Sequence, residues 1–240
     1  MTAFVDSRER LRPEPLVVKI GGSLLSGGRL AGIASTLARS RRGIVIVPGG
    51  GGFADEVRKA QSRHEVSDRT AHAMALLAMH QTGLLIEDLQ SRFVAVETIA
   101  EIRKSLRANV IPIWLPTRMC ATDSAIPENW SITSDGLAAR LAERLGFQAV
   151  VLVKSRRVGT GAAAAALAAE GVVDPEFANI VARADISFRI IGPGEERELA
   201  EICCATAPVS GKARRPAQRD IRPRRISRRA PPATPSPPRQ

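Results

Sequence analysis

The sequence predicts an α/β fold, a three-layer αβα sandwich with a mainly parallel central sheet. Short apolar runs rich in Val and Ile recur along the chain, and stretches with helical periodicity separate them. Uninterrupted apolar runs of this length are typical of strands that are covered on both faces. Because strands and helices alternate, the strands should pair in parallel between two helical layers.

Six apolar runs are expected to form the strands. They are residues 16–20 (LVVKI), 43–47 (GIVIV), 92–96 (RFVAV), 109–115 (NVIPIWL), 148–153 (QAVVLV) and 186–191 (ISFRII). Helices are expected at 29–40, from 53 onward, and at 67–90, 136–146, 162–171 and 195–205. Ser67 is a suitable N-cap for the third helix, and Gly146 is a suitable C-cap for the fourth.

Charge and composition divide the chain into three parts. The net charge is +11, but residues 206–240 contain ten Lys and Arg against one acid, and eight of the 16 prolines. This tail has no aromatic residue and no periodic apolar face, so it is expected to be disordered. We therefore predict a flexible N-terminus at 1–14, a folded domain at 15–205 and a disordered basic tail at 206–240. Any nucleic-acid partner would be bound through the tail alone.

Cysteine usage and hydropathy indicate the compartment. Cys120, Cys203 and Cys204 are odd in number and lack metal-ligand spacing, which favours a reducing environment. The first 15 residues carry charges where a signal peptide needs an apolar run, and no run of about eighteen apolar residues occurs. We expect a cytoplasmic protein without a membrane partner.

Residues suited to phosphate chemistry gather at the ends of four predicted strands. In parallel sheets the ligand site lies at the carboxyl edge, and glycines there let backbone N–H groups approach phosphate oxygens. Two lysines and an aspartate fit phosphoryl transfer, which depends on positioning and charge neutralisation. The candidates are Lys19, Gly21, Gly22 and Ser23 at the first strand, Gly49, Gly50 and Gly51 at the second, Ser134 and Asp135 after the fourth, and Lys154 at the fifth.

Each candidate also has a simpler explanation when it is taken alone. A strand followed by Gly21-Gly22 can be a tight turn, Asp135 can be a helix N-cap, and Lys154 can reach into water. The consecutive glycines from Gly49 are harder to explain in this way, because each costs about 0.5–1 kcal/mol relative to alanine. Only the joint placement of these residues favours a functional site.

Four segments in this order and spacing resemble the amino acid kinase superfamily: VVKIGGSLL, VPGGGGFAD, ITSDGLAARLAERLG and AVVLVKS, over about residues 15–192. The resemblance implies transfer of the γ-phosphoryl group of Mg-ATP without a P-loop. It implies that Lys19 and the Gly21-Gly22 backbone hold the transferred group, that Asp135 orients the lysines, and that Lys154 lies on the nucleotide side. Mg²⁺ would be held mainly by the ATP phosphates, with no metal site on the protein.

AHAMALLAMHQ and WSITSDGLAARLA are similar to the branch that contains the aminomethylfuranmethyl phosphate kinases of methanofuran biosynthesis. This branch converts a small phosphomonoester into a diphosphate. By analogy, Arg58, Asp68, His72 and Trp130 are candidates for the acceptor site, although His72 could equally be a core or surface histidine. A carboxylate from Asp123 or Glu128, and Trp114 as an alternative aromatic, would also suit a cationic heteroaromatic.

The sequence departs from the family where KSRRVG (154–159) replaces the usual hydrophobic-Asp-Gly turn. Arg156 or Arg157 could act there as an extra phosphate ligand. Besides the furan phosphate kinase, three other functions remain open. They are a uridylate or isopentenyl phosphate kinase, a catalytically weak nucleotide-binding subunit of the same fold, and a nucleic-acid binder that uses the tail. A homo-oligomer is expected.

The basic tail should be dispensable for folding, because its composition offers little surface to bury. A variant that ends at Ala205 should keep its cooperative thermal unfolding and its activity, and limited trypsin digestion of the full chain should remove the tail first. Loss of cooperative unfolding in the shortened chain would mean that the tail belongs to the domain.

Overall fold

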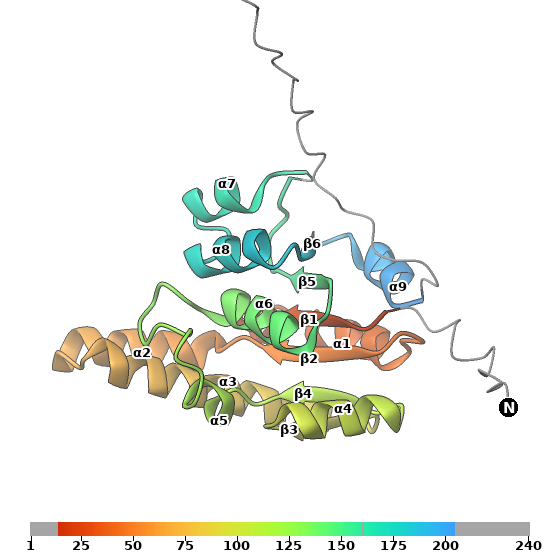
Figure 1. The fold of residues 1–240 in the computed structure, drawn as a ribbon, viewed down its shortest axis with the longest axis horizontal. Helices are drawn as coiled ribbons and strands as arrows, with labels where there is room; N and C mark the ends of the chain where they lie inside the picture. Colours follow the sequence, from red (N-terminus) through yellow and green to blue (C-terminus); the bar gives the residue numbers. More distant parts are fainter. Residues whose placement is uncertain (1–13, 160, 205–240) are drawn as a thin grey trace, which may run out of the picture.

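A computed structural model describes residues 14–159 and 161–204, which form an α/β sandwich (Figure 1). The expectations for the N-terminal 13 residues and for the tail concern residues outside this part of the chain. The sheet has six strands in the order β3-β4-β2-β1-β5-β6, and every neighbouring pair is parallel. The predicted fold class is therefore confirmed.

The strands lie where the apolar runs predict them. They are β1 Leu16–Ile20, β2 Ile44–Pro48, β3 Phe93–Val96, β4 Ile111–Trp114, β5 Ala149–Val153 and β6 Ser187–Ile191. The central strands β1, β2 and β5 are buried along their whole length, as strands covered on both faces must be.

The described helices include the six that the sequence predicts. They are α1 Leu30–Ala38, α2 Gly51–His64, α3 Asp68–Asp88, α4 Ile99–Arg107, α5 Thr117–Cys120, α6 Ser134–Leu145, α7 Ala164–Ala169, α8 Pro175–Arg183 and α9 Glu196–Cys204, with a short 3₁₀ helix at Gly22–Ser26. The Ser67 N-cap and the Gly146 C-cap are confirmed. The helices α4, α5 and α8 were not predicted, although Thr98 and Glu101 form a capping box before α4.

Two apolar clusters lie on opposite faces of the sheet. One face packs against α4, α6 and α8, and the other against α1, α9 and the C-terminal part of α3. The alternation along β1 sends Leu16, Val18 and Ile20 to the second face and Val17 to the first. Lys19 follows the same alternation as Val17, so its side chain lies on the α6 face.

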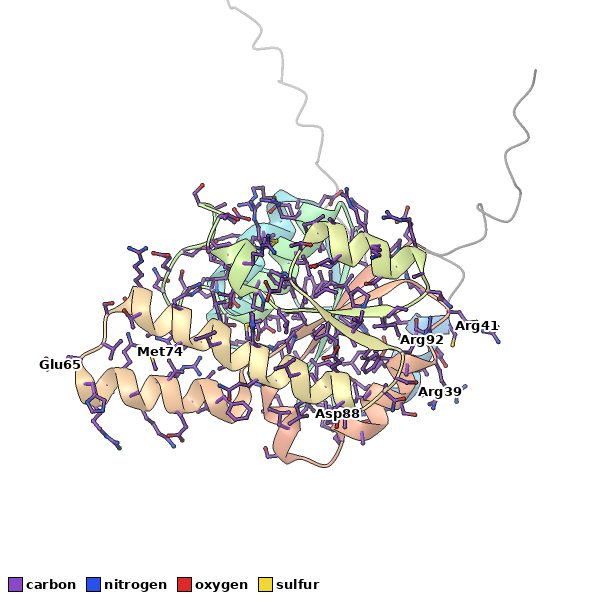
Figure 2. All side chains as sticks on the ribbon, turned by 90° about the horizontal axis from the view of Figure 1, so that it is seen from below. Arg39, Arg41, Glu65, Met74, Asp88 and Arg92 are labelled. Atoms are coloured by element: carbon purple, nitrogen blue, oxygen red, sulfur yellow. The ribbon has the colours of Figure 1, made fainter. Side chains whose placement is uncertain are left out.

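The connections leave β1 and β5 in opposite directions, since β1 leads to β2 on one side and β5 leads to β6 on the other. The carboxyl ends of β1 and β5 therefore form a topological switch point, where open parallel sheets bind their ligands. Helices α2 and α3 form a long antiparallel pair beside this edge. Its turn, at Glu65, lies far from the sheet, and Asp88 lies at the opposite end of α3 (Figure 2).

Within the described residues, no helix is both long enough and apolar enough to span a bilayer. The three cysteines are free thiols, and Cys203, in α9, is buried in the core. Burial raises the pKa of the Cys203 thiol to about 11, so it behaves as an inert core residue.

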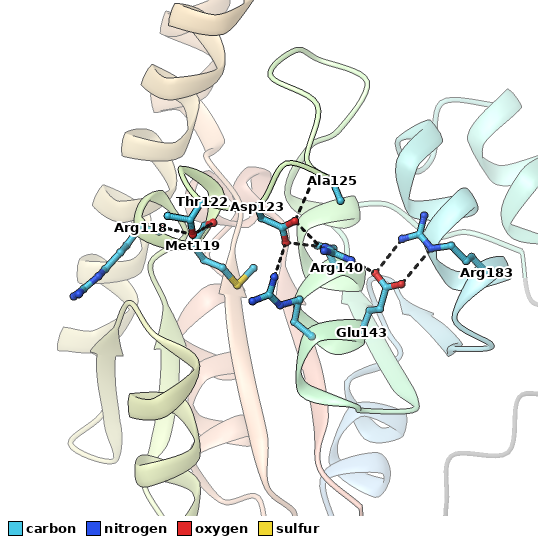
Figure 3. A network of polar contacts seen from close by, with 9 residues as sticks. Arg118, Met119, Thr122, Asp123, Ala125, Arg140, Glu143 and Arg183 are labelled. Carbon is cyan, nitrogen blue, oxygen red and sulfur yellow. Dashed lines mark hydrogen bonds and ion pairs between the residues drawn. The ribbon is translucent and has the colours of Figure 1, made fainter.

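An ion-pair network fixes the long segment between β4 and α6 (Figure 3). The carboxylate of Asp123 accepts hydrogen bonds from Arg140 Nη2 at 2.8 Å and Nε at 2.9 Å, and Arg144 adds a contact at 3.3 Å. Arg140 also reaches Glu143, which pairs with Arg183 of α8. The hydrogen bonds from Arg140 lower the pKa of Asp123 and outweigh the effect of burial. The network therefore ties this segment to two helices.

We predict that Asp123→Ala lowers the free energy of unfolding by about 2–3 kcal/mol, because it removes two of the three hydrogen bonds that Arg140, a largely buried arginine, makes to carboxylates. The folded pKa of Asp123 is depressed, so its contribution is present above the unfolded value of about 3.9 and is lost as the pH falls further. Arg197→Ala is the control, since its ion pair with Glu201 is exposed and should change stability little. Equal denaturation midpoints for both variants would contradict this.

Candidate active site

Strand register brings two lysines to one face of the sheet at the switch point. Lys19 pairs with Leu152 of the neighbouring strand β5, and Lys154 follows two residues later on the same face as Leu152. Both side chains are largely withdrawn from solvent, with 7% of the Lys19 side chain and 14% of the Lys154 side chain exposed. The explanation of Lys154 as a solvated strand end is therefore wrong.

Asp135, in the first turn of α6, lies between the two lysines. Lys19 Nζ is 2.9 Å from Asp135 Oδ1, and Lys154 Nζ is 2.5 Å from Oδ2. Burial by itself would raise the pKa of Asp135, but the two ammonium groups outweigh it and hold the pKa below its ordinary value. The carboxylate is therefore ionised and bridges two cations.

The surroundings of Lys154 disfavour its charged form, whereas those of Asp135 favour the charged form. Burial, and after it the charge of Lys19, lower the pKa of Lys154, and Asp135 offsets this only in part. Lys154 Nζ also donates a hydrogen bond of 2.8 Å to the carbonyl of Val172. Two buried ammonium groups beside a single carboxylate attract anions, and a phosphate would relieve their mutual repulsion.

Asp135 is not the N-cap of α6. The helix begins after Thr133, and the carboxylate that serves its first turn belongs to Asp174, which accepts hydrogen bonds from Thr133 N, Thr133 Oγ1 and Gly136 N. The carboxylate of Asp135 therefore does not cap the helix and instead contacts the two lysines. The explanation of Asp135 as a simple helix cap is wrong.

The two glycine loops pack backbone against backbone. A Cβ atom on Gly22 would lie 2.0 Å from Gly51 N and 2.4 Å from Gly51 Cα, which no side chain can satisfy. Gly51 also has φ +55°, in the left-handed region that favours glycine. Gly49 approaches Gly22 from the same side. The glycines therefore let the loops after β1 and β2 meet beside the lysine pair.

A cavity of about 210 Å³ opens next to these loops, between α2, α3 and the segment before α6. Its lining includes Gly22, Ser23, Gly49, Gly50, Gly51, Ser134, Arg58, His72 and Trp130, which are nine of the predicted site residues, together with apolar side chains of α3 and α6. Lys19, Asp135 and Lys154 do not line this cavity, although Ser134, which does, directly precedes Asp135. Most of the predicted phosphate and acceptor residues thus share one cavity, but Gly21 and Asp68 do not line it.

Arg58 and Trp130 form a cation–π pair at the cavity wall. The guanidinium carbon lies 4.1 Å from the centre of the indole ring, and Asp55 holds the other side of the guanidinium at 3.2 Å. Trp130 Nε1 donates to Gln61 Oε1 at 2.6 Å, and Gln61 Nε2 donates to Asp68 at 2.7 Å. Asp68 does not line the cavity, so its contact with the site runs through Gln61 and Trp130.

His72 lines the cavity with 8% of its surface exposed. Burial lowers the pKa of its imidazole, while the Asn129 backbone and the Glu128 carboxylate act in the opposite direction. The imidazole is therefore neutral at pH 7, and the ring nitrogen that is not bonded to the Asn129 backbone can contact a ligand.

Three further acceptor candidates lie elsewhere. Trp114 is fully buried in the core and cannot stack on a ligand, so that prediction is wrong. Asp123 is engaged by Arg140 in the network described above. Glu128 forms an exposed ion pair with Arg69 outside the cavity. Trp114 was a plausible candidate because the sequence of a strand shows which residues share a face but does not show which face borders the cavity.

Two residues with contacts to the site were not found from the sequence. Asp174 is described above, and its signal is the Asp-Pro pair at the start of α8, a typical N-cap and N1 combination. Arg29 donates to the carbonyls of Lys154 at 3.2 Å and Gly192 at 3.0 Å while it pairs with Glu196. Arg29 thus fixes the backbone where β5 and β6 end, and no sequence motif marks it.

The sequence profile of the amino acid kinase family matches residues 14–156. The chain belongs to this family, because the match covers more than half of its length. A similar protein is [5-(aminomethyl)furan-3-yl]methyl phosphate kinase of Methanocaldococcus jannaschii, 28% identical over 138 residues. That match covers 57% of this chain and 63% of the relative, which is less than two thirds of its length.

Solved structures of uridylate kinases share the fold. The enzyme of Archaeoglobus fulgidus superposes with a TM-score of 0.60 at 16% identity, over 81% of this chain and 98% of that one. The UMP kinase of Ureaplasma parvum gives a TM-score of 0.58 at 14% identity, over 80% of this chain and 95% of that one. At these identities the likeness concerns the fold alone.

The contact between the glycine loops gives a direct stability prediction. Gly22→Ala should lower the free energy of unfolding by an amount on the order of 3 kcal/mol, because the added methyl group overlaps the backbone of Gly51. Gly52→Ala is the matched control, since a Cβ at this helical position meets nothing within 4 Å and should stabilise the protein by about 0.5 kcal/mol. Chemical denaturation measures both, and equal midpoints would refute the predicted loop contact.

Proposed function

We propose that this protein transfers the γ-phosphoryl group of ATP to a small phosphomonoester and releases a diphosphate and ADP. The observation that carries the proposal is the buried carboxylate of Asp135 between the ammonium groups of Lys19 and Lys154. Membership of the amino acid kinase family and the glycine loops beside the lysines support it.

The proposed reaction requires no protein nucleophile. An oxygen of the acceptor phosphate attacks the γ-phosphorus, the bond from this phosphorus to the bridging oxygen breaks, and ADP leaves with the electron pair. Lys19, on the acceptor side, and Lys154, on the nucleotide side, would neutralise charge on the transferred group and the leaving group. Because Asp135 already holds both ammonium groups, little reorganisation accompanies the reaction.

In this proposal the acceptor phosphate lies in the cavity with Arg58, the one arginine or lysine among its lining residues. The face of Trp130 holds the Arg58 guanidinium in place, and His72 can hydrogen-bond to the phosphate or to a substituent. The rest of the lining is largely apolar, with Leu76, Met79 and Ile132 among it. A cavity of this size and character suits a small, flat acceptor.

The particular acceptor we propose is the aminomethylfuranmethyl phosphate of methanofuran-type cofactor synthesis. The similarity to the archaeal kinase named for this compound supports the assignment. Uridylate and isopentenyl phosphate are the alternative acceptors. The catalytically weak alternative rests on the KSRRVG segment, in which Arg156 and Arg157 are both exposed and remain candidates for contact with the nucleotide.

Mg²⁺, homo-oligomerisation and a cytoplasmic location remain parts of the proposal. No three His, Cys, Asp or Glu side chains of the described residues are placed to hold a metal ion together, and the proposal keeps Mg²⁺ on the ATP phosphates, where it would neutralise their charge. Four large apolar side chains are exposed on α2 and α3: Phe53, Leu77, Leu84 and Leu85. Because exposed apolar side chains often mark protein interfaces, these residues should be substituted first in a test of self-association. Nucleic-acid binding through the tail concerns residues outside the described part of the chain.

Lys19→Ala and Asp135→Ala should each lower kcat by a factor on the order of 10² or more, because each removes charge that acts in the transition state. Lys19→Arg should not restore turnover, since a planar guanidinium cannot replace a compact ammonium beside the glycine backbone. Thermal unfolding run in parallel separates chemistry from folding. Turnover of Lys19→Ala at the wild-type rate would end the phosphoryl-transfer assignment.

A panel assay tests the acceptor. The protein is incubated with Mg-ATP and either the aminomethylfuranmethyl phosphate, UMP or isopentenyl phosphate, and ADP release and product mass are measured. We expect the furan phosphate to give the highest kcat/KM and a diphosphate product. A preference for another acceptor would reject the furan assignment alone, whereas ATP binding without turnover of any acceptor would favour the non-catalytic subunit.

A further inference from the structure

Asp174 is a buried carboxylate to which the proposed reaction assigns no role. It lies 7% exposed at the N-cap of α8, yet its partners belong to two helices. Oδ2 accepts hydrogen bonds from Thr133 N at 2.9 Å, Thr133 Oγ1 at 2.7 Å and Gly136 N at 2.9 Å. Oδ1 accepts from Phe177 N at 2.8 Å. One carboxylate thus serves the N-termini of both α6 and α8.

Burial raises the pKa of Asp174, whereas its hydrogen-bond donors favour the carboxylate and need both of its oxygens as acceptors. The three backbone partners are N–H groups, which can only donate, and they occupy both oxygens. The two helix N-termini also favour a negative charge at this point. An asparagine has a single acceptor oxygen, so it can serve one helix while its NH₂ group faces the donors of the other.

The contacts of Asp174 lie on either side of Asp135. Thr133 precedes Asp135 by two residues and Gly136 follows it directly, so Asp174 fixes the first turn of α6 from both sides. The fit is close, because a Cβ on Gly136 would lie 2.5 Å from Asp174 Oδ1. The direction of the Asp135 side chain, and with it the position of both lysines, depends on this turn.

The segment that carries Asp174 also touches the second lysine. Lys154 Nζ donates to the carbonyl of Val172, two residues before Asp174. The negative charge of Asp174 raises the pKa of Lys154, in opposition to burial and to the charge of Lys19. Residues 172–174 therefore contact Lys154 directly, and they contact Asp135 only through Thr133 and Gly136.

We infer that Asp174 is a positioning residue for phosphoryl transfer, which holds the first turn of α6 so that the two oxygens of Asp135 face Lys19 and Lys154. This inference rests on the proposed function. It predicts that loss of Asp174 changes the chemical step more than substrate binding, because Asp174 does not line the cavity and, among its hydrogen-bond partners, Thr133 alone does.

Asp174→Asn tests the inference, with Thr98→Ala as the matched control. Thr98 caps α4 through its own capping box, far from the site, so its loss weakens a helix N-terminus without touching Asp135. We expect Asp174→Asn to lower kcat about tenfold or more with KM for both substrates nearly unchanged. Thr98→Ala should lower the melting temperature and leave kcat unchanged. Unchanged kcat in Asp174→Asn would overturn the inference.

A second measurement does not require activity. Acetic anhydride reacts with the unprotonated amine, so its rate of reaction with Lys154, followed by mass spectrometry, reports how readily this side chain is released from its ion pair and loses its proton. We expect faster modification in Asp174→Asn and in Gly136→Ala, whose methyl group pushes against Asp174 Oδ1, and the wild-type rate in Thr98→Ala. If no acceptor is turned over while these rates change as expected, the proposed function fails and the positioning contact stands. Wild-type rates in both site variants would overturn it.

Discussion

The carboxylate of Asp135 allows two lysine ammonium groups to lie together in the interior of the protein. Without this anion, the mutual repulsion of Lys19 and Lys154 and their removal from water would be prohibitive. The surrounding structure meets this requirement in detail. Strand alternation places both lysines on the α6 face, and the first turn of α6 places the Asp135 carboxylate between them. Asp174 accepts the N–H groups of this turn, so Asp135 is not needed as a helix cap.

The site has one part that can bind any phosphoryl group and another part that selects the acceptor. The lysines, Asp135 and the glycine backbone can recognise any phosphoryl group, because they offer charge and N–H donors and little shape. The cavity beside them is shaped by side chains from α2, α3 and the segment before α6, with Arg58 held against Trp130. Changes in these side chains can alter the acceptor without disturbing the chemistry, which is why the fold alone does not identify the substrate.

The sequence predicted those features that depend on local pattern. Apolar runs located six strands within one or two residues, and the rule for strand ends brought Lys19, Asp135 and Lys154 to one edge. Long-range pairing was not accessible. Asp174 accepts hydrogen bonds from residues about forty positions earlier in the chain. Asp123 was proposed as an acceptor-site residue because the sequence does not show that it pairs with Arg140. The burial of Trp114 likewise depends on how the helices cover the sheet.

Titration of the lysine ammonium groups by ¹⁵N-detected NMR tests the central claim most directly, with the wild-type protein compared with Asp135→Asn. The exposed Lys104 supplies a reference signal. If Asp135 holds both cations, the pKa of Lys154 lies below the ordinary lysine value of about 10.4 in the wild type and falls further in the variant, because burial and the charge of Lys19 then act unopposed by Asp135. A Lys154 that titrates like an exposed lysine in both proteins would contradict the account.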